Sequence, residues 1–190
     1  MIRKPAIVLF FVVIANTKNF GQSFMNSIGA NVSILFTKIN TAYLQENFVM
    51  QVNQFSYFPR FTLSESENSS VSIGAPLGAG IGILTSGGNS DGIAWSFDAP
   101  VVLDYNMGCK STPDNDEGFG SYFGAGFGYM YTGWSAYENN KAISYGPLAR
   151  VGMRFSGRNS NWHMSVGLFF KYGLEKEKYK TAGFNILADF

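Results

Sequence analysis

The stretch NWHMSVGLFFKYG, residues 161–173, decides the fold because two kinds of side chain alternate along it. Its even positions carry large apolar residues, namely Trp162, Met164, Val166, Leu168, Phe170 and Tyr172. Its odd positions carry mostly small or polar residues, namely His163, Ser165, Gly167, Phe169 and Lys171. A period of two places these two sets on opposite faces of a β-strand. The stretch therefore predicts a strand with one broad apolar face.

Seven other stretches repeat this period: 27–37, 48–61, 71–83, 95–106, 119–131, 145–155 and 184–190. Turn-rich segments such as TSGGNSDG and STPDNDEG separate them. Within 48–61 the apolar residues change parity between Val52 and Phe55, so we expect a β-bulge near Asn53. An even number of alternating strands suits a closed sheet. The sequence predicts one all-β domain, an eight-stranded antiparallel up-and-down transmembrane β-barrel.

The composition narrows the class of protein. The net charge is +1 and charged residues make up 14% of the 190 residues, with no basic stripe for nucleic acid. Cys109 and His163 are single residues of their kinds, so we expect neither an internal disulfide nor a metal site. No cofactor is expected.

The N-terminus has the order of a secretory signal. Arg3 and Lys4 precede an apolar run of 11 residues, 5–15, and a polar segment follows. The run is too short for a membrane-spanning helix, which needs about 20 residues. We expect residues 1–21 to be a cleaved signal peptide and residues 22–190 to be the exported barrel domain.

The two faces of the predicted strands distinguish a membrane barrel from a soluble one. A soluble, lipocalin-like barrel turns its apolar face inward and a charged face to water. Here the face opposite the bulky residues is poor in charge and carries glycines 74, 78, 80, 82, 120, 124, 126 and 128, which suits a crowded interior. We therefore place the apolar face against lipid.

Aromatic residues bracket this apolar face at a constant spacing. Three pairs stand ten positions apart: Trp95 and Tyr105, Tyr145 and Phe155, and Trp162 and Tyr172. Ten residues rise roughly 33 Å at about 3.3 Å each. A strand tilt of about 40° reduces this to roughly 25 Å, the height of the lipid-facing band between aromatic girdles.

The inward face gathers charged residues, for which we predict a lumen polar network. An eight-stranded barrel has room inside only for side chains, so buried charges must pair. We expect a lumen filled by side chains. The alternative is a pathway for ions or protons, which the spacing of these charged residues does not favour. The network comprises Arg60, Asp98, Asp104, Arg150, Arg154, His163, Lys171 and Asp189.

These stretches resemble the small eight-stranded outer-membrane β-barrel family, the OmpA/OmpX-like proteins. The resemblance is carried by YFPRF, SVSIGAPLGAGIG, FDAPVVLDYNMG, GFGSYFGAGFGYMYTG, YGPLARVGMRF and AGFNILADF. It implies a non-enzymatic barrel in the outer membrane, with a structural or adhesive role through its loops. It also implies that the barrel-assembly machinery reads the terminal Phe190 and that outer-membrane lipids surround the wall. The sequence does not identify a partner for the loops.

The resemblance leaves the side of each loop open. Such proteins have short periplasmic turns, longer outer loops and periplasmic termini. Here the connection at 107–117, on the expected periplasmic side, is as long as the expected outer loops at 38–47 and 133–143. The outer loops carry Tyr43, Trp134 and Tyr137, which suit either an interaction surface or interfacial anchors.

Two other functions remain as alternatives. His163 and Ser165 resemble the His-x-Ser pair of lipid A deacylase barrels, with Glu175 as a conceivable third member. Alternation turns both residues away from lipid, so we predict no enzyme. The other alternative is a soluble barrel that binds a small apolar ligand.

Two further motifs do not indicate a site. The GAGIG and GAGFG runs lie inside strands rather than before a helix, which excludes a dinucleotide-binding loop. The run DNDEG at 114–118 lacks the later ligands of a calcium-binding loop.

Overall fold

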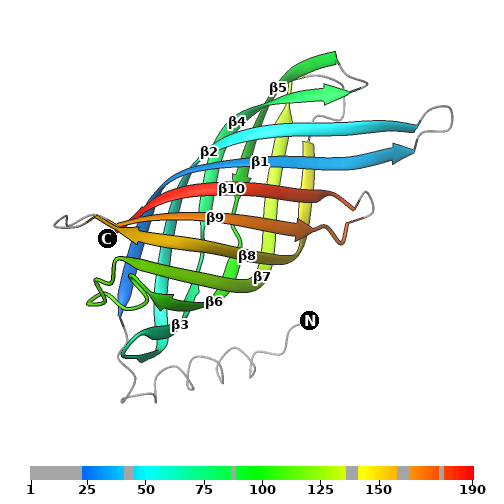
Figure 1. The fold of residues 1–190 in the computed structure, drawn as a ribbon. Coiled ribbons are helices and arrows are strands. Elements are labelled where there is room, and N and C mark those ends of the chain that lie inside the picture. Colours follow the sequence, from blue (N-terminus) through cyan, green and yellow to red (C-terminus); the bar gives the residue numbers. More distant parts are fainter. Residues whose placement is uncertain (1–22, 41–44, 87–88, 136–140, 158–162, 176–177) are drawn as a thin grey trace.

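The computed structural model describes residues 23–40, 45–86, 89–135, 141–157, 163–175 and 178–190 (Figure 1). The predicted signal peptide and Trp162 lie outside the described residues. Ten strands follow one another: β1 (Phe24–Asn40), β2 (Gln45–Ser66), β3 (Ser69–Gly74), β4 (Leu77–Ser86), β5 (Asn89–Asp98), β6 (Val101–Gly108), β7 (Phe119–Trp134), β8 (Lys141–Ser156), β9 (His163–Tyr172) and β10 (Lys180–Asp189). In the described ranges, no helix is long and apolar enough to cross a membrane.

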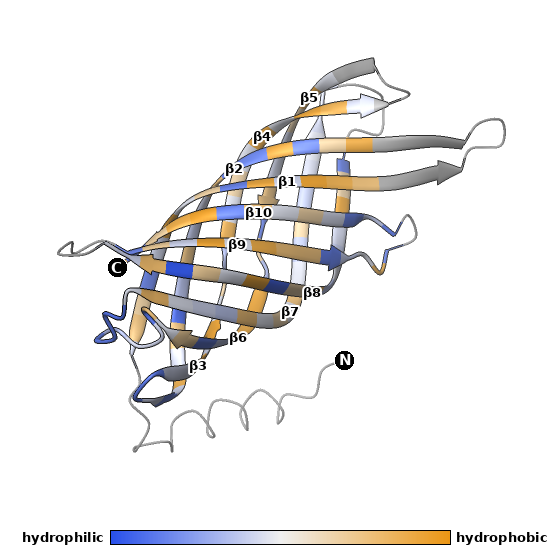
Figure 2. Cartoon of the chain, viewed as in Figure 1, coloured by the Kyte–Doolittle hydropathy of each residue, from blue (hydrophilic) through white to orange (hydrophobic). Residues whose placement is uncertain are grey.

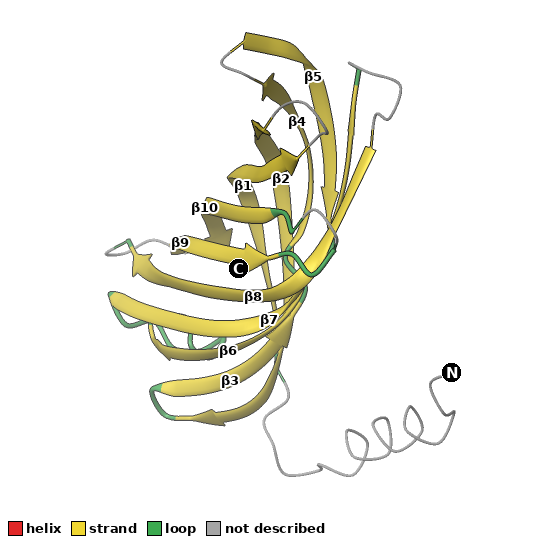
Figure 3. Cartoon of the chain, turned by 90° about the vertical axis from the view of Figure 1, so that its right-hand side faces the viewer, coloured by secondary structure: helices red, strands yellow, loops and turns green. Residues whose placement is uncertain are grey.

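The strands close into a ring of eight positions. Every pairing is antiparallel, and the wall closes because β1 pairs with both β10 and β2. β3 and β4 both pair with β2, and β5 and β6 both pair with β7, so each couple fills one position of the wall. Figures 1 and 3 show the strands curling around to form this wall. The predicted eight-stranded antiparallel barrel is confirmed.

Two positions of the wall are interrupted at Ala75–Pro76 and at Ala99–Pro100. Proline has no N–H to donate to a neighbouring strand, so an unbroken ladder cannot pass through it. The alanine before each proline still donates its N–H, Ala75 to the Pro59 carbonyl at 3.0 Å and Ala99 to the Tyr129 carbonyl at 2.9 Å. The inward and outward alternation therefore continues across both interruptions.

The predicted bulge near Asn53 is wrong. β2 pairs with β1 in unbroken register from Gln45 to Phe61, and its only register shift against β3 lies between Thr62 and Ser64. Met50 and Val52 instead point into the barrel and are fully buried. The apolar residues change parity because the interior is apolar at that end of the strand, not because the strand changes phase.

The outward face of the barrel is apolar over its whole circumference. Ile81, Ile93 and Leu168 are 69%, 68% and 59% exposed, although they belong to different parts of the wall. Along β8 exposed and buried residues alternate without a break from Lys141 to Phe155. Figure 2 shows the resulting change of hydropathy from residue to residue along the strands.

The two ends of the barrel carry different connections. The described N- and C-terminal residues meet where Asn26 and Phe190 exchange backbone hydrogen bonds of 3.0 and 2.9 Å. The β2–β3 turn, the β6–β7 loop and the β8–β9 connection lie at this termini end (Figure 1). The β1–β2, β4–β5, β7–β8 and β9–β10 connections lie at the opposite end. The long 107–117 connection therefore shares an end with the termini, and both expected outer loops lie at the other.

Candidate functional site

A cluster of five charged side chains fills the lumen near the termini end. This charged cluster consists of Arg60, Asp104, Arg150, Arg154 and Asp189, each at most 5% exposed. The Arg60 Nη2 and Arg154 Nε atoms lie 3.9 and 3.8 Å from the two carboxylate oxygens of Asp189. The Arg150 Nε atom lies 3.6 Å from Asp104 Oδ1. The cluster thus ties β2, β6, β8 and β10 together across the interior.

Three guanidinium groups face two carboxylates in the cluster, and aromatic rings complement two of the three, those of Arg150 and Arg154. The guanidinium carbons of Arg150 and Arg154 lie 4.6 and 4.7 Å from the ring centroid of Tyr122. Arg150 also lies 4.6 Å from the Phe58 ring. A cation near an aromatic face in a dry interior gains about 2 kcal/mol or more. Tyr122 is therefore a central residue of the cluster, and alternation alone did not identify it.

Two glycines make room for Tyr122. A Cβ atom on Gly152 or on Gly167 would collide with the Tyr122 hydroxyl or with the ring carbon that bears it. Gly152 and Gly167 face each other across β8 and β9. The crowded interior predicted from the inward glycines is present here, because the ring lies over the neighbouring strand β8, where Tyr122 pairs with Gly152, and its hydroxyl reaches Gly167 on β9.

The β6–β7 loop, residues 109–118, closes the termini end of the lumen, and we call it the closing loop. The carbonyl oxygen of Lys110 accepts hydrogen bonds from Arg60 Nη2 at 3.1 Å and from Arg154 Nη1 at 3.3 Å. Ser70 Oγ donates to the Ser111 carbonyl, and Asn115 Nδ2 donates to the Glu67 carbonyl at 3.3 Å. Cys109, the first residue of the loop, is fully buried, and this burial raises the pKa of its thiol.

The charged groups of the closing loop pair with one another and with His163. Lys110 Nζ donates to Asp116 Oδ1 at 2.8 Å, and this hydrogen bond, with the positive charge, lowers the pKa of the Asp116 carboxyl. His163 Nε2 lies 3.4 Å from the same oxygen. His163 therefore contacts the closing loop, and on the barrel wall it pairs with Asp189 of the charged cluster.

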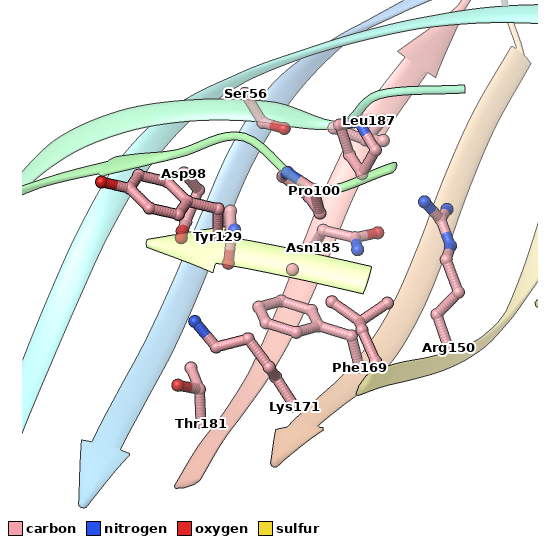
Figure 4. A pocket seen from close by; sticks show the side chains of 14 residues that line it. Ser56, Asp98, Pro100, Tyr129, Arg150, Phe169, Lys171, Thr181, Asn185 and Leu187 are labelled. Carbon is pink, nitrogen blue, oxygen red and sulfur yellow. The ribbon is translucent and has the colours of Figure 1, made fainter. Parts of the chain in front are cut away.

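Asp98 and Lys171, the last two residues of the predicted network, line a small cavity in the middle of the barrel (Figure 4). Its volume open to water is about 40 Å³, room for roughly three water molecules. Gln54 Nε2 donates to Asp98 Oδ2 at 2.8 Å, and Lys171 Nζ donates to the Ser144 carbonyl at 3.4 Å. The predicted network thus extends over the charged cluster, the closing loop and this cavity, which Arg150 of the charged cluster also lines.

An apolar cluster occupies the lumen toward the opposite end, and sequence reasoning missed it. It contains Leu35, Met50, Val52, Leu84, Ala94, Met130, Trp134, Ala142 and Tyr179. Trp134 is 8% exposed and points inward, so its assignment to an exposed rim is wrong. Its even position, in phase with Tyr122 and Met130 on β7, is a signal that could have identified it as an inward residue. Tyr43 and Tyr137 lie outside the described residues.

The structure does not assemble the conceivable triad. His163 and Ser165 are 4% and 2% exposed and face the lumen at the start of β9. Glu175 lies beyond the other end of β9, where its carboxylate accepts the N–H groups of Tyr179 at 2.6 Å and Tyr145 at 3.2 Å. The length of β9 therefore separates the carboxylate from the histidine. Among the described residues, no group of three or more His, Cys, Asp or Glu side chains is arranged to hold a metal ion.

The remaining aromatic candidates lie on the outer wall. Tyr105 and Phe155 stand toward the termini end and contact Phe123 and Phe119, with ring centroids 5.4 and 5.6 Å apart. Trp95, Tyr145 and Tyr172 stand toward the opposite end and are 49%, 40% and 37% exposed. The terminal Phe190 side chain is 65% exposed.

Comparison with known proteins identifies this architecture. No protein-family model and no curated protein sequence matches the chain. Outer membrane protein OprG of Pseudomonas aeruginosa is 12% identical, covering 90% of this chain and 96% of its own, with a TM-score of 0.54. The attachment invasion locus protein Ail of Yersinia pestis is 13% identical, covering 90% and 99%, with a TM-score of 0.54. Outer membrane protein AlkL, solved in lipid bilayers, is 14% identical, covering 90% and 91%, with a TM-score of 0.51. The chain therefore has the fold of the small eight-stranded outer-membrane β-barrel proteins.

Proposed function

We propose that this chain is a non-enzymatic outer-membrane β-barrel with a side-chain-filled lumen. It spans the membrane with its apolar outer wall and acts structurally or in surface attachment through the connections at the end opposite the termini. The observation that carries this proposal is the continuous apolar outer face. Soluble monomers rarely expose one apolar patch larger than a few hundred Å², whereas a lipid-facing band must be apolar.

The filled lumen supports a structural role over a channel. The closing loop and the charged cluster occupy the termini end, and the apolar cluster occupies the other. Between them the cavity is open to about 40 Å³, too little for a continuous water path. The lumen of such a barrel stabilises the wall rather than conducting solutes.

The attachment role is supported by the arrangement of the strands. β1 and β2 pair as far as Asn40 and Gln45, well beyond Phe36, where β1 leaves β10. This hairpin projects from the barrel in Figure 1. The similar protein Ail is named an attachment invasion locus protein, and we propose the same class of role for the projecting end of this chain.

Outer-membrane fractionation with gel migration before and after boiling tests the proposal. We expect the chain in the outer-membrane fraction, with faster migration when unboiled because a closed barrel resists detergent. Recovery as a soluble protein would favour a ligand-binding barrel instead. Adhesion of cells that express the wild-type chain, compared with a chain whose β1–β2 hairpin is shortened, tests the attachment role separately.

A further inference from the structure

The outer wall carries an apolar groove where β8, β9 and β10 lie side by side. This wall groove is lined by Ala149, Val151, Leu168, Phe170 and Ala182, with a volume of about 430 Å³. It forms because Phe170 pairs in register with a small residue on each side, Ala149 on β8 and Ala182 on β10. The lining is almost wholly apolar, so an aliphatic chain fits it better than any polar ligand.

A positive charge stands directly beyond one end of the wall groove. Lys180 precedes Ala182 by two positions on β10 and pairs with Tyr172, which follows Phe170 by two positions on β9. Its ammonium nitrogen lies 5.8 Å from the centroid of the Tyr172 ring. Lys180 therefore stands above an outer-wall aromatic residue, one pair of residues beyond the groove, where a lipid head group meets its acyl chains.

No carboxylate of the described residues neutralises this charge. The nearby Glu175 is 8% exposed and is turned inward onto backbone N–H groups. The exposed lysines of the described part, Lys141, Lys178 and Lys180, all lie toward the end opposite the termini. Its exposed acids lie at the termini end: Glu65, Glu67, Asp114, Asp116 and Glu117. The exposed charges described at the groove end are therefore positive, and they suit an anionic partner.

We propose that the wall groove and Lys180 bind an anionic phospholipid, whose phosphate carries the net negative charge of its head group, from the leaflet opposite the termini. The phosphate lies against the Lys180 ammonium, and one acyl chain lies along Leu168 and Phe170. This site rests on the proposed membrane location of the barrel and names a specific lipid class for one sector of its wall.

Native mass spectrometry of the purified full-length barrel in mixed phosphatidylglycerol and phosphatidylcholine micelles tests the site. We expect the wild type to retain phosphatidylglycerol preferentially. Lys180→Gln should reduce that preference about fivefold, because one basic residue near a lipid surface contributes about 1 kcal/mol. Ala182→Phe, which fills the groove, should reduce retention of both lipids.

Two control variants make the outcome specific. Lys141→Gln removes the same charge on β8, four residues before Tyr145 in the sequence. Ala79→Phe adds the same ring at an outward position on another strand, β4. Both variants should retain lipid as the wild type does. An unchanged preference in Lys180→Gln would overturn the site, as would displacement of the lipid by inorganic phosphate alone. Heat-modifiable migration of the same preparations shows separately whether the barrel itself is folded and membrane-competent.

Discussion

At the residue scale, the lumen buries more cationic than anionic side chains. Arg60, Arg150 and Arg154 share Asp104 and Asp189, and Tyr122 supplies the remaining stabilisation through its ring. Removing one partner of a buried ion pair costs more than the pair contributes, because the remaining charge stays buried. The carboxylates are therefore the most sensitive members.

Asp104→Asn is expected to lower the free energy of unfolding by about 3 kcal/mol, because Arg150 keeps its buried charge without a carboxylate. Urea unfolding of the refolded barrel in micelles measures this change. Asp116→Asn is the matched control, since Asp116 is 70% exposed and a surface pair contributes at most about 1 kcal/mol. Equal losses in the two variants would show that the cluster is not the stabilising element.

Gly167→Ala is expected to destabilise the barrel by about 1–3 kcal/mol, because the added methyl group meets the Tyr122 hydroxyl. Tyr122→Phe should recover part of this loss in the double variant by removing that oxygen. The same unfolding measurement on both single variants and the double variant gives the coupling. Strictly additive effects would contradict the packing of Tyr122 against Gly167.

At the scale of the elements, alternation predicted all eight wall positions, since lipid and lumen impose opposite chemistry on the two strand faces. The same rule placed Arg60, Asp104 and Asp189 inside. It failed at Met50, because the lumen is itself apolar there and the apolar residues change to the inward parity. Trp134 was predicted in a loop, although it is the last, inward residue of β7. The contacts of the closing loop were beyond prediction, because a loop has no period and Lys110 acts through its carbonyl oxygen.

The closing loop gives a prediction at this scale. Cys109 is buried with a raised thiol pKa, so a neutral alkylating reagent should modify it slowly in the folded barrel. Asp116→Asn removes the partner of Lys110 and should increase the rate. The expected order is wild type slower than Asp116→Asn, and both slower than the urea-unfolded chain. Modification of the wild type as fast as the unfolded chain would show that the loop does not close the lumen.

The pairing of Lys110 and Asp116 also sets a pH dependence. The folded pKa of Asp116 is lower than its ordinary value, so the pair stabilises the loop above that ordinary value. This stabilisation is lost as the pH falls through the depressed folded pKa. Amide hydrogen exchange in residues 110–117 should therefore show less protection in acid than the intrinsic pH dependence explains, and Asp116→Asn should remove the difference.

At the scale of the whole molecule, the barrel has an apolar outer wall and a lumen filled by the charged cluster at one end and by the apolar cluster at the other. A filled lumen predicts that the wild type shows no steady single-channel conductance in planar bilayers. A variant with a shortened closing loop should keep the charged cluster in place. It should therefore also show no steady conductance. Stable conductance steps in the wild type would contradict the proposed filled lumen.

The central claim is that the apolar face contacts lipid, and spin labels at successive positions of β9 test it most directly. In a Cys109→Ser background reconstituted into bilayers, labels at Val166, Leu168 and Phe170 should collide readily with oxygen and rarely with a water-soluble nickel complex. A label at Ser165, whose side chain is buried in the lumen, should be shielded from both reagents. Frequent collisions of the nickel complex with the label at Leu168 would contradict the account.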